Sequence, residues 1–520
     1  MTETNVLLDA VEKTAATHPD APAFRSAGEA ETSYGQLWAN VCAIASGLAD
    51  IPGRGPVLVL GPKTALTVEC LLACLMSGHA YVPVDAELPA QRVANIAGQI
   101  EGAVLVAACD IPEALAGVLS GVCLIDARDF MGAHTPTAPR SLPRKTWVSG
   151  EKTQYIIFTS GSTGRPKGIE VTQANVASFR SWLVDFPVIR EGGRTFLDQA
   201  NYSFDLSEFE LVGALTTGGC LHAVDASELT DYRRLFDDLA SSGIDVWVST
   251  PSFADACLAD PSFSGVLLPR VRLFLFCGET LHHTTAAKLH ERFPKATVAN
   301  TYGPTESTVA VTYCEVTDEM LDDAAPLAVG HPRPGTELAI VDHETGEPVA
   351  PGETGEVIIS GDTVAHDYYE SPEKTAAAFF ATTLSDGTPT RGYRTGDLGF
   401  IAPDGMLHVV GRLDSLVKLN GFRIELGEVE GALEEIGYVR HAVVVPATRV
   451  GRISSLCAFV VVGPGAPEGG SFAVARALKA ELAKGLPAYM VPRQVRILDE
   501  MPLNANGKAD RKSLAASVSR

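Results

Sequence analysis

Short apolar runs alternate with longer amphipathic stretches along most of the chain. The amphipathic stretches place apolar residues at helical spacing, as in Leu8–Ala15, Tyr34–Leu48 and Tyr232–Leu239. The apolar runs have the length of buried β-strands and cover Pro56–Leu60, Tyr81–Val84, Val104–Ala107, Val122–Ile125, Tyr155–Phe158, Val246–Ser249 and Leu273–Phe276. This alternation predicts an α/β fold with parallel sheets and helices on their faces. A functional site is then expected beyond the carboxyl ends of the strands.

The pattern changes twice in the second half of the chain. Between Glu337 and Ser360, short strands alternate with Gly/Pro turns, which indicates a small β-rich subdomain at about 335–410. After Gly411–Ser415, strands and helices mix in a shorter unit. We therefore predict an N-terminal core over residues 1–410, a junction at 411–414 and an α+β C-terminal domain over 415–520.

Composition and charge argue against several classes of protein. The 520 residues are 46% hydrophobic, and their net charge of −22 argues against binding of nucleic acid or anionic membranes. From Gly411 onward, however, the chain has 15 basic and 11 acidic residues, a net charge of +4. This charge is explained equally well by an acidic partner and by a chance bias of the surface. The longest apolar region, Ala65–Val84, contains Glu69 and His79, so a buried helix and strand explain it better than a membrane span. Ten scattered cysteines without a CxxC pair predict free thiols and a cytoplasmic protein.

A loop rich in glycines, hydroxyls and cations directly follows the strand-like run Tyr155–Phe158. Glycine N–H groups can approach an anion closely, and hydroxyl and cationic side chains add hydrogen bonds and charge, so this loop is typical of a polyphosphate site. Its spacing differs from that of a Walker A loop, and a flexible surface loop is the plain alternative. The segment runs Thr159, Ser160, Gly161, Ser162, Thr163, Gly164, Arg165, Pro166, Lys167, Gly168.

Three further segments carry side chains that suit a nucleotide. In Asn300–Glu306, Tyr302 offers a ring to a base and Glu306 offers a carboxylate to Mg²⁺. Asp397 follows a turn and can accept hydrogen bonds from ribose hydroxyls. An Asn-Gly turn projects Lys508 from a loop, which suits a lysine delivered by a mobile domain. Each segment alone is explained equally well by an ordinary turn or a solvated loop.

Together, the order and spacing of these segments resemble the adenylate-forming superfamily of acyl-CoA synthetases, luciferases and adenylation domains of nonribosomal peptide synthesis. Other resembling segments are Thr32–Leu37, Ser77–Asp85, Ser203–Ser207, Val246–Phe253, Phe274–Glu279 and Asn300–Thr312. The resemblance covers nearly the whole chain and is strongest to the stand-alone ligases that load D-alanine onto a carrier protein. It implies a large N-terminal domain of two parallel-type αβαβα sheets plus a small β subdomain, followed by a mobile C-terminal α+β domain.

The resemblance also implies ATP and Mg²⁺ as cofactors and a role for each matched position. Lys508 would bridge the attacking carboxylate and the α-phosphate. Thr305 and Glu306 would serve the α-phosphate and Mg²⁺, and Asp414 would be the hinge of the mobile domain. The remaining nucleotide contacts would come from Thr159, Ser160, Gly161, Ser162, Thr163, Gly164, Lys167, Asn300, Thr301, Tyr302, Asp397 and Arg412.

Asp205 points to an amino acid as the substrate. An acidic side chain in an apolar run is costly to bury unless it is paired. In the family members that act on amino acids, the acid at the matching position pairs with the substrate ammonium group. A cap of the following helix is the alternative. Cys277 matches the cysteine that crowds the methyl position of the L-enantiomer in D-alanine ligases, whereas Phe209 departs from their methionine. The other implied lining residues are Leu206, Thr301 and Val309. D-Alanine is the expected substrate, with glycine, L-alanine, serine and proline open.

The second substrate is expected to be a thiol supplied in trans. The chain carries no carrier segment after Lys508, so we expect it to load an acidic phosphopantetheinylated carrier protein and to release AMP and pyrophosphate. The sequence does not indicate an oligomeric state, and a monomer is the default expectation. A coenzyme A ligase for a small acid is one alternative, against which Asp205 argues. A nucleotide-binding scaffold without chemistry is another, against which Lys508, Glu306 and Asp397 argue.

Overall fold

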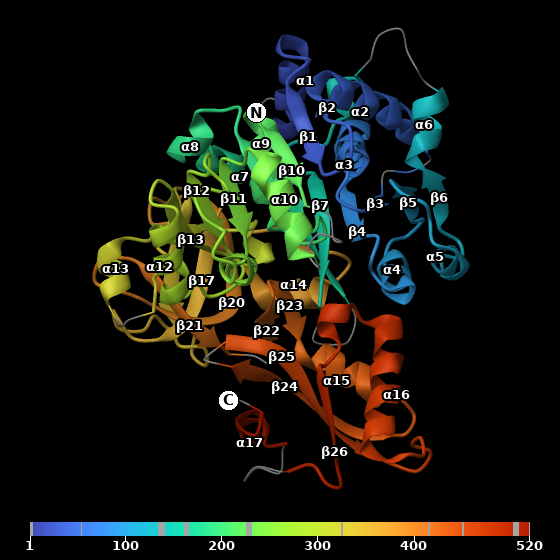
Figure 1. Ribbon diagram of the computed structural model, residues 1–520, viewed down its shortest axis with the longest axis vertical. Coiled ribbons are helices and arrows are strands. Elements are labelled where there is room, and N and C mark those ends of the chain that lie inside the picture. The colour runs from blue at the N-terminus through green and yellow to red at the C-terminus, as the bar shows by residue number, and fades with distance from the viewer. Residues whose placement is uncertain are drawn as a thin grey trace.

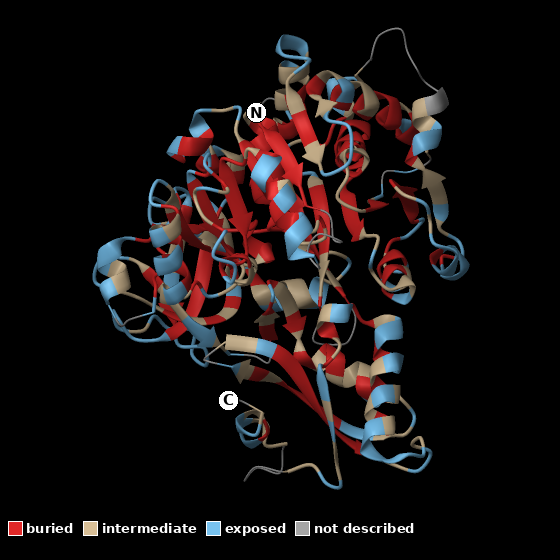
Figure 2. Cartoon of the chain, in the orientation of Figure 1, coloured by how far each residue is buried: buried red, intermediate tan, exposed pale blue. Residues whose placement is uncertain are grey.

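The computed structural model describes residues 4–51, 53, 55–133, 141–160, 166–224, 231–323, 326–413, 416–449, 452–502 and 509–518. A large N-terminal domain holds three sheets, and a smaller C-terminal domain lies at one end of it (Figure 1). Buried residues fill the strands and the helix faces that cover them, while exposed residues gather on outer helix faces and loops (Figure 2). None of the described helices is both long and apolar enough to cross a membrane. All ten cysteines are described and are free thiols, as predicted.

The largest sheet has nine strands within the described residues, in the order β15-β14-β13-β12-β11-β9-β10-β1-β2. Its central strands pair in parallel, as the alternation predicts, but its edge strands β2, β14 and β15 are antiparallel. The strands are β1 (Pro22–Ser26), β2 (Thr32–Ser33), β9 (Thr195–Asp198), β10 (Cys220–Ala223), β11 (Val246–Ser249), β12 (Leu273–Phe276), β13 (Thr297–Tyr302), β14 (Thr312–Glu315) and β15 (His331–Pro332).

The second sheet has seven strands within the described residues, in the order β18-β8-β7-β4-β3-β5-β6. Strands β7 and β8 form an antiparallel hairpin that pairs Thr159 with Lys167, so the two ends of the glycine-rich loop lie side by side. The strands are β3 (Val57–Gly61), β4 (Tyr81–Asp85), β5 (Val104–Ala107), β6 (Cys123–Asp126), β7 (Thr153–Thr159), β8 (Lys167–Thr172) and β18 (Asp367–Tyr368).

Helices cover both of these sheets, and α3 (Ala65–Ser77) shows how the sequence sets their ends. The Thr64 hydroxyl accepts a hydrogen bond from the Thr67 N–H at its start, and Gly78 ends it in the left-handed conformation. The long apolar region is therefore a buried helix followed by β4, as predicted. The other helices of this domain are α1 (Val6–Thr17), α2 (Tyr34–Ala49), α4 (Ala90–Ala97), α5 (Glu113–Val118), α6 (Ala127–Ala133), α7 (Gln173–Leu183), α8 (Pro187–Arg190), α9 (Ser207–Thr216), α10 (Tyr232–Ser242), α11 (Pro251–Leu258), α12 (His283–Arg292), α13 (Asp318–Asp322) and α14 (Pro372–Ala378).

A third, antiparallel sheet lies in the segment where the sequence changes to short strands separated by Gly/Pro turns. It consists of β16 (Thr336–Val341), β17 (Gly355–Gly361), β19 (Phe379–Thr383), β20 (Pro389–Ile401) and β21 (Leu407–Arg412). Strands β20 and β21 pair Asp397 with Arg412, which brings two predicted site residues together across the ladder.

The C-terminal domain contains a hairpin, a three-stranded sheet and helices within its described residues. The hairpin of β22 (Leu416–Leu419) and β23 (Phe422–Glu425) extends toward the large sheets, whereas the final helix lies on the far side of the domain (Figure 1). The domain has its own apolar core, centred on Ile424, Val429, Val444 and Leu478. Its other elements are α15 (Leu426–Glu434), β24 (Val439–Arg449), β25 (Arg452–Val462), α16 (Gly470–Gly485), β26 (Gln494–Leu498) and α17 (Arg511–Ala516).

Candidate active site

The predicted site residues of the N-terminal domain come from loops at one edge of the nine-stranded sheet. Asp205 follows β9, Cys277 directly follows β12, and Glu306 follows β13. These loops lie beyond the carboxyl ends of strands that run in the same direction, where a parallel sheet places its ligand site. The topology therefore brings these predicted residues to the edge of the sheet at which a functional site is expected.

Asp205 is buried at the base of a small cavity, with 5% of its surface exposed. Helix α9 has Leu206 as its N-cap residue and no side-chain cap, so Asp205 does not serve the helix as a cap. Burial raises the pKa of Asp205 to about 6, against the opposing effects of a hydrogen bond with Thr305 and the charge of Lys418. No arginine of the described residues forms an ion pair with this carboxyl group, which leaves it available to a cation.

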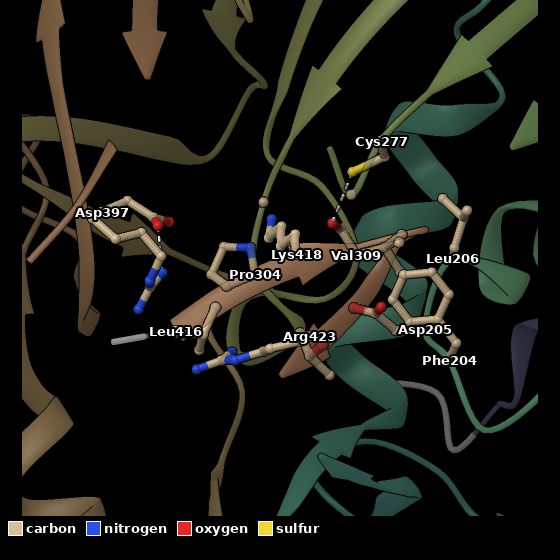
Figure 3. A pocket seen from close by; sticks show the side chains of 15 residues that line it. Phe204, Asp205, Leu206, Cys277, Pro304, Val309, Asp397, Leu416, Lys418 and Arg423 are labelled. Atoms are coloured by element: carbon tan, nitrogen blue, oxygen red, sulfur yellow. Dashed lines mark hydrogen bonds and ion pairs between the residues drawn. The ribbon is translucent and has the colours of Figure 1, made fainter. Parts of the chain in front are cut away.

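The cavity around Asp205 has many apolar lining residues, and charged side chains also line it, with Lys418 and Arg423 between Asp205 and Asp397 (Figure 3). Cys277 is 3% exposed, and its Sγ lies 3.7 Å from the carbonyl oxygen of Val309. Val309 and Thr308 both have positive φ angles, of 69° and 58°, which is strained backbone for β-branched residues and typical of functional sites. The lining residues are Phe204, Asp205, Leu206, Cys277, Gly278, Gly303, Pro304, Thr305, Val309, Asp397, Arg412, Leu416, Lys418, Gly421 and Arg423.

Phe209 and Thr301 differ from their predicted places in this wall. Phe209 is fully buried, does not line the cavity, and packs edge-on against Phe179 at 5.1 Å between ring centroids. It lies within α9, further into the core than the cavity, where it belongs to the large apolar cluster of the domain. The Thr301 hydroxyl donates to the Phe276 carbonyl, and Thr301 lines the neighbouring, larger cavity.

Glu306 is the most strongly held carboxylate of the site. It is fully buried in a short 3₁₀ turn and accepts hydrogen bonds from Arg423 Nη1 at 2.7 Å and from the Tyr368 hydroxyl at 2.8 Å. Lys167 Nζ lies 3.4 Å away. Burial alone would raise the pKa of Glu306, but the charges of Arg423 and Lys167 hold it well below its ordinary value. The carboxylate is therefore anionic and surrounded by cations.

A second cluster lies between the domains, around a cavity of about 520 Å³. The Tyr302 hydroxyl donates to Asp397 Oδ2 at 2.6 Å, and Arg412 forms an ion pair with Asp397. Asn300 Nδ2 donates to the Ala328 carbonyl at 2.8 Å, while the buried Asn300 Oδ1 has no hydrogen-bond partner among the described residues. All four side chains line this cavity, so a donor that enters it can satisfy the free amide oxygen.

The β22–β23 hairpin of the C-terminal domain closes the site from the opposite side (Figure 3). The Gly421 N–H donates to Glu279 Oε1 at 2.8 Å, and a Cβ at Gly421 would lie only 2.3 Å from Thr250 Cγ2. Ser160 Oγ donates to the Arg423 carbonyl at 2.7 Å and accepts from the Glu425 N–H at 3.1 Å. The tip of the hairpin therefore fits closely against the N-terminal domain.

A buried ion pair and stacked rings extend this contact. Arg92 of α4 pairs with Glu428 of α15, and both side chains are almost fully buried. The Phe422 ring stacks on Tyr489 at 3.8 Å and lies 6.3 Å from Phe204. Because removing one partner of a buried ion pair is strongly destabilising, Arg92 and Glu428 hold the two domains in this arrangement.

Several predicted residues fall outside the described residues. These are Gly161, Ser162, Thr163 and Gly164 of the glycine-rich loop, together with Asp414 and Lys508. The two ends of the loop are described, and Thr159 Oγ1 is buried without a partner among the described residues. Met501 and Ala509, on either side of Lys508, pack with Val443 and Cys457 on the C-terminal sheet.

Sequence reasoning missed three residues that complete the site. Tyr368 contacts Glu306, Arg423 contacts it from the C-terminal domain, and Glu279 accepts from the Gly421 N–H. The sequence signal for Arg423 is its place two residues after Gly421, which lies at the tip of the β22–β23 hairpin. Tyr368 lies far from Glu306 in the chain, and only the pairing of β18 with β8 brings them together.

Comparison with known proteins places these features in a family. The model of the AMP-binding enzyme matches residues 11–369, and that of the AMP-binding enzyme C-terminal domain matches residues 428–508. A D-alanine–D-alanyl carrier protein ligase of Bacillus licheniformis is 42% identical over 515 residues, which cover 98% of this chain and 99% of that protein. The ligase of the same name from Bacillus velezensis is 40% identical, with the same coverage.

Solved structures agree with this assignment. Holo-PA1221, a protein with adenylation and PCP domains bound to a vinylsulfonamide inhibitor, is 28% identical, with a TM-score of 0.82 over 98% of this chain and 84% of that one. The crystal structure of IdnL1 is 27% identical, with a TM-score of 0.77 over 96% of this chain and 99% of that one. The chain belongs to the AMP-binding enzyme family.

Proposed function

We propose that the chain is an ATP-dependent ligase that adenylates D-alanine and transfers it to the phosphopantetheine thiol of a separate carrier protein. The observation that carries this proposal is the buried Asp205 carboxyl in a small cavity walled by Cys277 and Val309. That cavity adjoins the cluster of Glu306, Tyr302 and Asp397. Such an arrangement supports the binding of an ammonium group, and with it a substrate carboxylate, beside a nucleotide.

The substrate assignment rests on size and charge. Asp205 provides the counter-charge for the α-ammonium, and the uncharged lining residues Leu206, Cys277 and Val309 suit a small, uncharged substrate side chain. In this arrangement the cavity holds only about 30 Å³ of free space, room for a few small groups. The curated relatives carry names that specify D-alanine. We assign to Cys277, which lines the cavity, the role of crowding the methyl group of the L-enantiomer.

In the first reaction, a substrate carboxylate oxygen attacks the α-phosphorus of ATP, the bond to pyrophosphate breaks, and an aminoacyl-adenylate forms. The chain's cations reduce the repulsion between the two anions. Lys167 is held beside Glu306, and Asp397 with Arg412 is placed to hold the ribose. The free Asn300 Oδ1 can accept from the amino group of adenine, and Tyr302 offers its ring.

The residues present also fit Mg²⁺. Glu306 is an anionic oxygen ligand with the Thr305 hydroxyl beside it in the sequence, and hard oxygen donors are what Mg²⁺ prefers. Bound there, Mg²⁺ would neutralise phosphate charge during the displacement. In the present arrangement Arg423 supplies the positive charge at this carboxylate instead.

In the second reaction, the carrier thiol attacks the acyl carbon, the thiol proton leaves, and AMP departs as a thioester forms. The two reactions need different groups at one place, so we propose that the C-terminal domain rotates at the junction 411–414, with Asp414 as the hinge. In this structure the β22–β23 hairpin faces the site. The residues flanking Lys508 pack on the C-terminal domain's own sheet, and α17 lies at the far side of the molecule (Figure 1). The arrangement therefore suits transfer, and the rotated one would bring Lys508 to the α-phosphate.

ATP–pyrophosphate exchange tests the proposal directly. We expect exchange with D-alanine to be faster than with L-alanine, glycine, D-serine, L-serine or L-proline. A clear preference for L-proline or L-serine would refute the substrate while leaving the class of enzyme intact. Exchange with aliphatic acids alone would support a coenzyme A ligase, and no exchange with any acid would support a non-catalytic scaffold. Sedimentation at micromolar concentration tests the proposed monomer.

A further inference from the structure

A basic groove lies on the C-terminal sheet, separate from the two cavities of the active site. It has a volume of about 480 Å³ and crosses the adjoining ends of β24, β25 and β26. Three exposed arginines, Arg449, Arg493 and Arg496, line it, and no acidic residue does so in the described part of the chain. The other lining residues are Ala447, Thr448, Ser454, Ser455, Gln494, Ser517 and Val518.

The three arginines have no acidic partner among the described residues. Arg496 lies over the Phe459 ring at 5.7 Å and donates weakly to the Ser517 carbonyl at 3.4 Å, which directs its guanidinium along the groove. Most other exposed arginines of this chain, such as Arg128 and Arg272, are paired with carboxylates. An unpaired arginine cluster on a chain with a net charge of −22 is a surface that attracts carboxylates locally.

The groove adjoins the opening between the domains. The β24–β25 hairpin ends near Arg452, which forms an ion pair with Asp255 and donates to the hydroxyls of Thr284 and Thr285 at 3.1 Å. Arg452 and Ile453 line the large inter-domain cavity, and the next residue, Ser454, lines the basic groove. A carrier protein whose phosphopantetheine group enters that cavity past Arg452 would therefore have its folded domain beside the groove.

We infer that Arg449, Arg493 and Arg496 form the docking groove for an acidic helix of the carrier protein during thiol transfer. The inference rests on the proposed function and names the surface that recognises its second substrate. The acidic N-terminal domain repels an acidic carrier, so attraction confined to this groove orients the carrier as well as binding it.

The experiment uses the full chain and a phosphopantetheinylated D-alanyl carrier protein that the wild-type chain loads. In the triple variant Arg449→Glu, Arg493→Glu, Arg496→Glu, we expect the KM for this carrier to rise at least about tenfold at low salt. Exchange of ATP and pyrophosphate, and transfer to free pantetheine, should change less than about twofold, since neither uses the groove. The KM of the wild type should rise with ionic strength, and that of the triple variant should depend on it less.

The matched control is Arg440→Glu, an exposed arginine at the opposite end of β24, about 30 Å along the strand. It should leave the carrier KM unchanged. Reversal of the acidic residues of one carrier helix to lysine should restore loading by the triple variant. An unchanged carrier KM in the triple variant, or an equal loss with free pantetheine, would overturn the groove assignment. Failure of the wild type to exchange with D-alanine would instead refute the proposed function.

Discussion

The two halves of the site are held in place by different interactions. Asp205 and Glu306 stand on loops at the ends of strands in one large sheet, and both are buried within the N-terminal domain. Lys418 and Arg423 stand on a two-stranded hairpin that meets this half through hydrogen bonds, stacked rings and ion pairs across a domain boundary. The first half is fixed by the core of its domain, and the second by contacts that another orientation of the domain would break.

This difference indicates which half each reaction depends on. The N-terminal half carries the groups to which we assign recognition of the amino acid and the nucleotide, and Asp205 and Glu306 are buried within its own domain. The hairpin adds Arg423 to a carboxylate that also suits Mg²⁺. A cation from the chain and a cation from solution would then occupy the same carboxylate at different stages.

The largest expected effect comes from removing the charge in the fixed half. Asp205→Ala should reduce exchange with D-alanine by at least about 1,000-fold, because the substrate ammonium would enter a buried pocket with no counter-charge. Initial rates and thermal unfolding would be measured together. Asp238→Asn, which changes an acid paired with His222 away from both cavities, should leave exchange intact. Substantial exchange by the Asp205→Ala variant would mean that the pocket does not recognise the ammonium.

The second-largest expected effect distinguishes the role of the hairpin from that of the N-terminal half of the site. Arg423→Ala removes one partner of a buried ion pair that exists only across the domain boundary, so it should destabilise this arrangement more than others. We expect transfer to the carrier to fall about 10- to 100-fold, while exchange stays within about threefold. Single-turnover transfer from preformed adenylate measures the first quantity. Equal losses in both reactions would show that Arg423 also serves adenylation, and the contrast between the halves would then fail.

The sequence predicted the half of the site that lies within the N-terminal domain better than the half that lies on the β22–β23 hairpin. The alternation of apolar runs predicted the sheets. The motifs predicted Asp205 and Glu306, which follow strands β9 and β13, and Asp397, which lies within strand β20 and not in the loop that its turn had indicated. The antiparallel strands at the sheet edges and the contact of Tyr368 with Glu306 depend on pairing between distant segments of the chain. A local sequence pattern does not predict such pairing. The contacts of Arg423 and Arg92 depend on how two domains meet, so their partners could not be read from either domain alone.

A smaller effect concerns the ionisation of Asp205. Its pKa, raised by burial to about 6, means that the carboxyl is charged above pH 6 and neutral below it. Since only the charged form pairs with an ammonium group, kcat/KM for D-alanine should fall toward tenfold per pH unit below about 6. Glu306 stays anionic in this range because its pKa is held well below its ordinary value. Asp205→Asn should show low activity without this dependence, and a wild-type profile that is flat down to pH 5 would contradict the assignment.

The smallest effect tests the shape of the fixed half rather than its charge. Cys277 is held by burial against the Val309 carbonyl, and Val309 itself has strained backbone, so the position of the sulfur is well defined. Cys277→Ala removes this one atom from the wall, and loss of one small group that contacts the substrate in an apolar pocket weakens discrimination on the order of 10-fold. We expect the preference for D- over L-alanine in exchange to narrow about 3- to 10-fold, mainly because L-alanine improves. Cys257→Ala, which changes a buried cysteine of the other core cluster, is the matched control and should leave the ratio unchanged. If the ratio were the same in both variants, chirality would be set elsewhere, and the strained turn at Thr308 and Val309 would be the next wall to alter, because it is the other rigid surface beside Asp205.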